Sequence, residues 1–229
     1  HRPFRVGNDV TEANPLLKPE RLDGVEGGVR FEPLNRVKID ATLYWNRLHD
    51  AIANVTLGVG PGLFPGGNFL PAGGTYRQRL NLDRMESWGV ELTAQAPLGA
   101  TLDVNASYVY AHARVTRASA SPDLEGLRPA QSPRHQGRLG LLWHPPGQFA
   151  ANASLNWISG QYDDDQNQRL LKGAATVDAR LTWRPTDNAD VSVTAQNLFD
   201  KTVMSALSGT GLVTRAAPQT ILIEFGLHY

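Results

Sequence analysis

The 229-residue sequence contains no cysteine, and this absence removes three classes of protein at once. Small disulfide-stabilised folds, thiol enzymes and metal sites with cysteine ligands all require thiols. Net charge is also missing, because 22 basic residues balance 22 acidic ones. No strong positive field is therefore available to hold nucleic acid by its phosphates. With 41% hydrophobic and 19% charged residues, the composition is nevertheless that of a folded protein.

Long hydrophobic runs are absent as well, since the longest purely apolar stretches span only a few residues, as in 141–143. A transmembrane helix needs roughly 20 apolar residues, so none is predicted. A membrane-spanning β-strand is still possible, because it needs an apolar side chain only at alternate positions. Residue 1 is His and no secretory signal pattern follows it, so we expect either a processed precursor or part of a longer protein.

A period of two runs through most of the sequence and predicts β-strands. In 102–110, 149–157, 175–183 and 221–229, one face is apolar at 20 of 20 positions and the other at only 3 of 16. Such alternation indicates strands with one dry face and one wet face. A weaker form of the pattern covers 22–31, 37–46, 88–96, 137–144 and 189–198. The nine strands are each about ten residues long, against roughly 5–6 in an average soluble sheet.

The connections between these strands alternate between short and long. The short ones lie at 32–35, 97–99, 145–147 and 184–188, and the long ones at roughly 50–75, 117–133, 160–173 and 199–214. This asymmetry is typical of an outer-membrane barrel, with short periplasmic turns and long external loops. We therefore predict an all-β fold, an antiparallel meander of about 9–10 long strands that forms part of a transmembrane β-barrel. A soluble β-sandwich is the competing fold, and it shows no such strict alternation.

The five tryptophans support the membrane interpretation because all of them fall on the apolar faces of their strands. They are Trp45, Trp88, Trp143, Trp157 and Trp183. Phe149 and Trp157 lie eight residues apart on one strand, which corresponds to about 20 Å along a tilted barrel axis. Aromatic girdles flank an apolar band of about 25 Å in such barrels.

The alternation of short and long connections predicts on which side of the membrane each end of the chain lies. If the short turns are periplasmic, the last strand ends inside at Tyr229, and segment 1–21 lies outside. Bacterial barrels usually have an even number of strands and both termini inside. An odd count therefore predicts that an N-terminal portion is missing, and His1–Val6 is a candidate for the end of a tenth strand.

Five segments, in order, resemble motifs of the TonB-dependent outer-membrane receptors. Segment 12–20 (EANPLLKPE) resembles their N-P-x-L-K-P-E signature, and 225–229 resembles the terminal strand with its closing aromatic, here Tyr229. The others are 26–30 (EGGVR), 88–92 (WGVEL) and 196–201 (QNLFDK). The resemblance covers essentially all of residues 1–229. It implies the C-terminal portion of a barrel of about 22 strands, without the N-terminal strands, the plug domain and the short box that contacts the coupling protein.

The resemblance also implies a function and partners. It implies a receptor in the outer membrane of a Gram-negative bacterium for energy-coupled uptake of a scarce nutrient, such as an iron–siderophore or cobalamin. Its partners would be outer-membrane lipid, the plug domain, a TonB-type energy-coupling protein, the barrel-assembly machinery and a small-molecule ligand. Phe225, Leu227 and Tyr229 would form the barrel-assembly signal. A passive outer-membrane pore or adhesion barrel is the alternative.

Candidate binding residues lie in the predicted external segments. Arg77, Arg79, Arg84, Arg114 and Arg117 could attract an anionic ligand or lipopolysaccharide. Tyr162 is a further ligand candidate. Asp163, Asp164 and Asp165 offer hard oxygen ligands for a cation such as calcium, although no glycine-punctuated 12-residue loop frames them. The competing interpretation is a solvated loop tip.

Enzymatic chemistry has little support in the sequence. Residues 58–62 (GVGPG) resemble a phosphate-binding loop, but no helix follows them, so we expect a flexible external loop. The six histidines are scattered without a metal-binding spacing, and no nucleophile elbow is present. We therefore predict no enzyme and no cofactor. Glu91, Asp103, Asp178, Arg180 and Glu224 are predicted to face the barrel interior as a charge lattice that contacts the plug.

Overall fold

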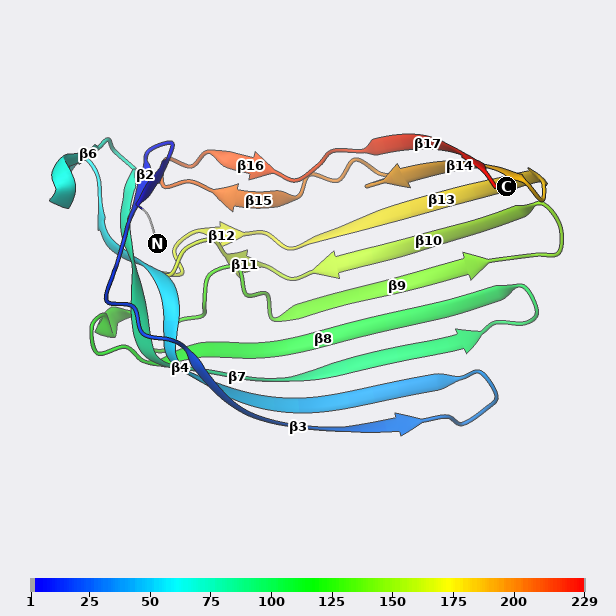
Figure 1. Ribbon diagram of the computed structural model, residues 1–229, viewed down its shortest axis with the longest axis horizontal. Helices are drawn as coiled ribbons and strands as arrows, with labels where there is room; N and C mark the ends of the chain where they lie inside the picture. The colour runs from blue at the N-terminus through cyan, green and yellow to red at the C-terminus, as the bar shows by residue number, and fades with distance from the viewer. Residues whose placement is uncertain (1–2, 229) are drawn as a thin grey trace.

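The computed structural model describes residues 3–228 and consists almost entirely of β-strands (Figure 1). Nine strands of 8 to 23 residues make up the main sheet. They are β3 (Arg21–Phe31), β4 (Lys38–Val59), β7 (Thr75–Pro97), β8 (Leu102–Arg117), β9 (His135–Trp143), β10 (Phe149–Ile158), β13 (Ala174–Thr186), β14 (Ala189–Gln196) and β17 (Thr220–Leu227). Each of the nine predicted strands is confirmed, and no described residue belongs to an α-helix.

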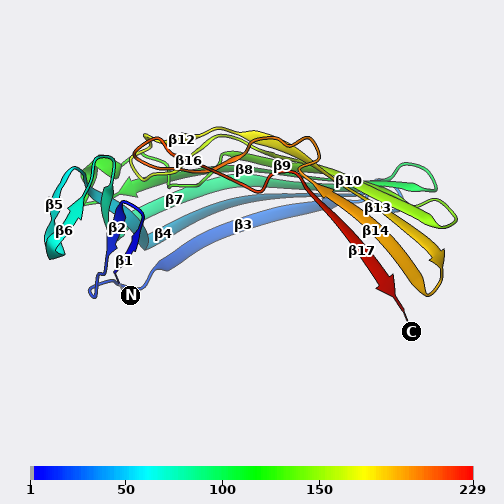
Figure 2. The same ribbon diagram turned by 90° about the horizontal axis from the view of Figure 1, so that it is seen from above.

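The nine strands form one antiparallel sheet in the order β3-β4-β7-β8-β9-β10-β13-β14-β17. Every long strand therefore pairs with the long strand before it in sequence, which confirms the predicted meander. Seen from above, the sheet is curved and open, like a section of a barrel wall (Figure 2). Within residues 3–228, no helix is both long enough and apolar enough to cross a membrane.

The register places the apolar alternating positions of all nine strands on one face, which we call the outer face. Direct partners in an antiparallel ladder point to the same side of the sheet. One row across the sheet illustrates this, and its members are Val29, Ala41, Leu92, Tyr108, Gly137, Trp157 and Ala175. Large side chains on this face are uncovered; Ile223, for example, is 61% exposed. Nothing in the described chain covers this face, as expected of a surface that contacts lipid.

The opposite, inner face is polar and carries hydrogen bonds between strands. Arg180 Nη1 lies 2.9 Å from Glu224 Oε2, and Thr182 and Ser192 share a hydrogen bond of 3.0 Å. Asn156 Nδ2 donates to Asp178 Oδ2 at 2.8 Å. The predicted dry and wet faces are thus confirmed by the pairing of the strands.

The tryptophans occupy the two edges of the apolar band, as predicted. Trp45 and Trp88 are direct cross-strand partners at the external end. Phe149 and Trp183 are direct partners at the other end, beside the short turns (Figure 1). Gly99 and Gly147 make two of these turns possible, because their φ values of 92° and 118° lie in the region that favours glycine.

The prediction of a loop over residues 50–75 is wrong in its extent. β4 continues to Val59 and β7 begins at Thr75, so the two strands pair far beyond the apolar band. The period of two is locally disturbed, because Asp50 has a φ of +52° and the β4–β7 ladder shifts between Thr56 and Gly58. Pairing between two strands satisfies the backbone in water as well as in lipid, so the ladder needs no continuous apolar face.

A small hydrophobic core holds this β4–β7 extension against the loop that follows β8. Its buried members are Ala51, Val55, Leu82, Val115, Ala118 and Leu124. The loop turns through the 3₁₀ helix η2 (Pro122–Leu124), and its Ala118 N donates to Glu125 Oε1 at 2.9 Å. The external end of the protein is therefore packed, rather than a set of independent flexible loops.

Short hairpins make up the rest of the external end (Figure 1). They are β1 (Phe4–Val6) with β2 (Asp9–Glu12), β5 (Gly62–Phe64) with β6 (Asn68–Leu70) through the 3₁₀ turn η1 (Pro65–Gly67), β11 (Gln161–Tyr162) with β12 (Leu170–Leu171), and β15 (Met204–Leu207) with β16 (Val213–Arg215). Phe4–Val6 pairs only within the first hairpin, so the long meander has nine strands rather than ten in the described residues. His1, Arg2 and Tyr229 lie outside the described residues.

Candidate functional site

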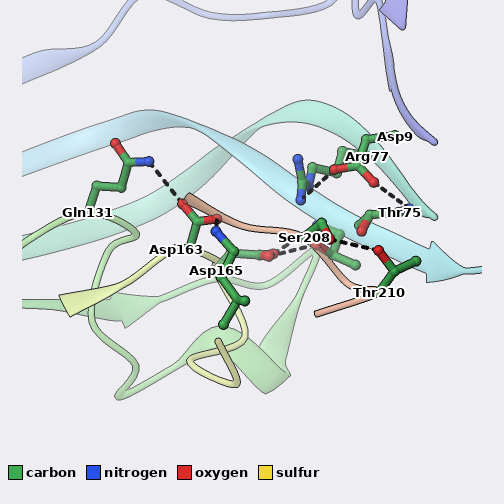
Figure 3. Close-up of polar contacts among 10 residues, drawn as sticks. Asp9, Thr75, Arg77, Gln131, Asp163, Asp165, Ser208 and Thr210 are labelled. Atoms are coloured by element: carbon green, nitrogen blue, oxygen red, sulfur yellow. Dashed lines mark hydrogen bonds and ion pairs between the residues drawn. The ribbon is translucent and has the colours of Figure 1, made fainter. Parts of the chain in front are cut away.

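Five segments that are distant in sequence surround a cavity of about 770 Å³ at the external end, which we call the external cavity. Its wall comes from the β1–β2 hairpin, from the β4–β7 extension and from the loops that follow β8, β10 and β14. The residues that carry its polar contacts are shown in Figure 3. A volume of this size is sufficient for a small-molecule ligand.

Asp163 and Asp165, in the loop that follows β10, connect that loop to three of the other segments. Asp163 accepts hydrogen bonds from Gln131 Nε2 at 3.0 Å and from Leu207 N at 2.8 Å (Figure 3). Asp165 accepts from Thr56 N at 2.8 Å and from Thr56 Oγ1 at 2.6 Å. Because a carboxylate accepts several hydrogen bonds and these are strengthened by its charge, two side chains suffice to join the loops to the β4–β7 extension.

Asp164 has a different role, within its own loop. It is 6% exposed and accepts from Gln168 N and from Arg169 N, the latter at 2.7 Å. The three neighbouring carboxylates thus bind separate protein donors. Within residues 3–228, no group of three or more His, Asp or Glu side chains is arranged to hold a metal ion.

The first hairpin contributes the opposite wall of the external cavity. Asp9 accepts a hydrogen bond from Thr75 N at 2.9 Å, and its Oδ2 lies 3.4 Å from Arg77 Nη2 (Figure 3). Strand β2 runs parallel to β7, with Val10 opposite Tyr76. The hairpin therefore adds to the edge of β7 at a level that β8 does not reach.

The segment that carries the N-P-L-L-K-P-E motif continues this contact as a strap across the β4–β7 extension. Asn14 Nδ2 donates to the carbonyl of Arg79 at 2.9 Å. Asn81 bonds to both backbone groups of Lys18, at 2.8 and 3.0 Å. Glu20 Oε1 accepts from Ile52 N at 2.7 Å. The polar residues of the motif thus hold the strap, and with it the wall of the external cavity.

The predicted ligand residues separate into two groups. Arg77 lines the external cavity, and Tyr162 lies close to it, with the Arg128 guanidinium 4.7 Å above its ring. Arg79 Nε donates to Asn54 Oδ1 at 3.4 Å. Arg114 and Arg117 do not line the external cavity. The β7–β8 register places Arg114 at the external edge of the outer face, and Arg117 follows it beyond a shift of that register. The lining carries four aspartates and a single arginine, so it is acidic rather than basic.

Two contacts of this site have no recognisable sequence signal. Thr56 and Asn81 belong to no motif. Thr56 lies within segment 50–75, which we expected to be a loop, and Asn81 lies between that segment and the predicted strand 88–96. The only sequence feature that marks these two residues is that each is polar. Their roles depend on partners 109 and 63 residues away, respectively.

The inner face supplies a second polar surface. A cavity of about 590 Å³ near the short turns is lined by Arg36, Lys38 and Asp103, among others. Asp103 lies 2.8 Å from His144 Nε2 and 3.5 Å from Arg36 Nη2. Glu91 shares this face, between its direct partners Thr42 and Val109. Ion pairs on the inner face join Asp103 to Arg36 and Arg180 to Glu224. A wider charge lattice and its contact with a plug stay predictions.

Comparison with known proteins agrees with this architecture. The family model described as "TonB dependent receptor-like, beta-barrel" matches residues 4–198. The chain is 26% identical over 200 residues to the "Iron-regulated outer membrane virulence protein" of Vibrio cholerae serotype O1, in an alignment that covers 86% of this chain and 30% of that protein. It is 24% identical over 220 residues to the "Ferrioxamine receptor" of Yersinia enterocolitica, covering 93% and 28% respectively.

Among solved structures, the ferric yersiniabactin uptake receptor FyuA of Yersinia pestis superposes with a TM-score of 0.70 at 19% identity. The superposition covers 91% of this chain and 30% of FyuA. At this identity the likeness concerns the fold alone. The chain spans less than a third of the length of the curated relatives it matches.

Proposed function

We propose, because the chain belongs to the TonB-dependent receptor-like β-barrel family, that it serves energy-coupled uptake of a scarce nutrient, with a ferric chelate as the first candidate. We further propose that the chain forms part of the wall of a barrel in the outer membrane of a Gram-negative bacterium, which the family and the register of the sheet support. The relatives include an iron-regulated outer-membrane virulence protein, a ferrioxamine receptor and a ferrichrome outer-membrane transporter.

One structural observation carries the proposal, namely the combination of an apolar outer face, a polar inner face and a cavity at the external end. The external cavity is where the ligand would first bind, since five segments at the external end form its wall. The polar inner face would then line the path inward and contact a plug domain. A TonB-type coupling protein, the barrel-assembly machinery and outer-membrane lipid complete the set of proposed partners.

Transport assays with the full-length receptor in its own membrane test the proposal. Cells that lack the gene, cells that carry it and cells that carry it without the coupling protein would be compared for uptake of radioactive iron from a panel of ferric chelates at low concentration. Uptake that requires both the receptor and the coupling protein supports the proposal.

The same assay separates the proposal from a passive pore or an adhesion barrel. A pore would show uptake that is proportional to concentration and indifferent to the coupling protein. An adhesion barrel would show no uptake of any chelate or of cobalamin. Either result would reject energy-coupled uptake while leaving the barrel architecture intact.

A further inference from the structure

The charged side chains that line the external cavity are nearly all of one sign. Its lining includes the carboxylates of Asp9, Asp163, Asp164 and Asp165, and Arg77 is the one basic side chain among the described lining residues. A ligand that enters the external cavity therefore meets a negative electrostatic field. This field bears on which ferric chelates the proposed uptake function would accept.

The hydrogen bonds of the three neighbouring aspartates do not neutralise them. Asp163 and Asp165 accept from backbone amides, side-chain amides and a hydroxyl, and Asp164 accepts from backbone amides of its own loop. All of these donors are uncharged. Within residues 3–228, none of the three carboxylates takes part in an ion pair. Their negative charges are therefore uncompensated.

The arginines of the cavity wall are engaged by other partners. Arg77 Nη2 lies 3.4 Å from Asp9 Oδ2 (Figure 3), which compensates the charge of both groups. The Arg5 guanidinium donates to two backbone carbonyls, and that of Arg128 lies 4.7 Å above the ring of Tyr162. An anionic ligand would have to displace one of these partners before it could bind a guanidinium.

The external cavity also offers a polar group without a partner and uncovered apolar side chains. Thr75 is fully buried, and its hydroxyl forms no hydrogen bond with the described residues. Because Thr75 lies two residues before Arg77 on β7, its side chain points to the same face of the strand. Buried hydroxyls nearly always have a partner, so this one is available to a ligand. Val6 and Leu212 line the external cavity and are 69% and 71% exposed.

We propose, on the basis of the uptake function proposed above, that the external cavity selects a ferric chelate of net positive charge that carries an ammonium group on an aliphatic chain. An ammonium group has three donors, and the carboxylates of Asp163 and Asp165 have further lone pairs to accept them. Val6 and Leu212 provide contacts for the aliphatic chain. Opposite charge favours this ligand, whereas chelates of net negative charge are repelled.

Chelates that differ only in their terminal group test this proposal. Three singly charged hydroxamates neutralise a ferric ion, so a linear ferric tris(hydroxamate) with a terminal amine is cationic at neutral pH. Its N-acetyl derivative is neutral and its N-succinyl derivative is anionic, with the same iron coordination. Binding to the full-length receptor in detergent would be measured by isothermal titration calorimetry. Affinity should fall in the order cationic, neutral, anionic, and the affinity for the cationic chelate should fall as salt is added.

The D163N/D165N variant removes two charges and keeps an acceptor at each position. It is expected to weaken binding of the cationic chelate by roughly 2- to 30-fold, with little change for the neutral chelate. The D123N/D187N variant is the matched control, because both residues are exposed and neither lines the external cavity. It should bind all three chelates like the unchanged protein. Heat-modifiable migration on gels shows that each variant is folded before it is titrated.

Three results would overturn the proposal. One is equal affinity of the unchanged receptor for the three chelates, and another is binding of none of them. The third is an equal loss of affinity for the neutral and the cationic chelate in D163N/D165N, which would mean that the aspartates only position their loop.

Uptake by cells distinguishes this proposal from the uptake function on which it rests. Uptake of all three chelates at equal rates, dependent on the coupling protein, would overturn charge selection and leave energy-coupled uptake intact. Binding in the expected order without coupled uptake of any ferric chelate would reject the uptake function and support charge selection at the external cavity.

Discussion

The side-chain amide of Asn81 bonds to the backbone of Lys18 in both directions, with Oδ1 accepting from Lys18 N at 2.8 Å and Nδ2 donating to the Lys18 carbonyl at 3.0 Å. Nδ2 also donates to the carbonyl of Asp50 at 2.6 Å. The Asn81 side-chain amide therefore makes the pair of hydrogen bonds that the backbone of a neighbouring strand residue would otherwise make with Lys18. It ties the strap to both strands of the β4–β7 extension.

Asn81→Ala should release the strap. The loss of these bonds is expected to cost about 1–3 kcal/mol locally without unfolding the sheet. Hydrogen exchange of residues 13–20 in the full-length protein should rise, while exchange in β9 and β10 stays slow. Asn188→Ala is the control, because Asn188 donates to the His228 carbonyl at the opposite end of the sheet. Unchanged exchange in the strap of the Asn81 variant would contradict this role.

Asp165→Ala should loosen the loop that carries residues 163–165 from the β4–β7 extension, because Thr56 loses both of its bonds to the carboxylate. Asp165→Asn keeps an acceptor and should have a smaller effect. Residues 1–229 contain no cysteine, so within them spin labels would attach only to cysteines introduced at Leu57 and Lys172 of the full-length protein. A broader distance distribution by electron paramagnetic resonance is expected in the alanine variant. Asp187→Ala, in a short turn at the far end, should leave the distribution narrow.

The attachment of the loop after β8 should depend on pH through Asp83. Hydrogen bonds from Ser119, followed by the charges of Arg117 and Lys18, hold the pKa of Asp83 below its ordinary value of 3.8. A carboxyl group with a depressed pKa in the folded state contributes stability above its unfolded pKa and loses it as pH falls through the folded value. Ser119 N, which donates to Asp83 Oδ2 at 2.6 Å, should then be released in acid.

Cleavage by pepsin measures this release, since pepsin is active in the required acid range. Cutting near Leu124 should increase as pH falls below the ordinary pKa, after correction for cutting at a loop that Asp83 does not touch. In the Asp83→Asn variant, the corrected rate should not change with pH. A pH-independent rate in the unchanged protein would show that Asp83 does not hold the loop.

Gly89→Val should impair assembly of the sheet, whereas Gly27→Val should not. A Cβ at Gly89 would overlap the backbone carbonyl of Tyr110 and approach the ring of Tyr44, its direct partner on β4. A Cβ at Gly27 meets nothing within 4 Å and points to the outer face. Overpacking of this kind costs about 1–3 kcal/mol. The folded, heat-modifiable fraction in the outer membrane is the measurement, and equal fractions would contradict the expectation.

Adjacent substitutions on β4 test the two faces directly. Ala41 lies on the outer face, in the row of Leu92, and Ala41→Lys would place a charge in lipid at a cost of about 2–4 kcal/mol near the midplane. Thr42 lies on the inner face opposite Glu91, so Thr42→Lys should be tolerated. Urea unfolding of the full-length protein in vesicles compares them. If the two variants lost equal stability, the assignment of lipid and lumen faces would be wrong.

The period of two was enough to predict all nine long strands, the meander and the two faces. In β10, for example, Phe149, Leu155 and Trp157 point outward because alternation is a property of the extended backbone and needs no distant partner. The same reasoning missed the external extensions of β4 and β7, because the period of two is disturbed at Asp50. There the strands persist because they pair with each other.

The candidate site depended on contacts between distant segments. Composition and position predicted Arg77, Arg114 and Arg117 together, but the structure separates them. Arg77 lines the external cavity, whereas Arg114 lies on the outer face and Arg117 follows it beyond a shift of the β7–β8 register. The sequence alone determined which side chains lie on the apolar outer face and which on the polar inner face, since the face of a strand residue is shared with the residues two positions away. Tertiary structure decided that Asp165 meets Thr56 across 109 residues, because loop positions follow from how the strands pair and not from any local pattern.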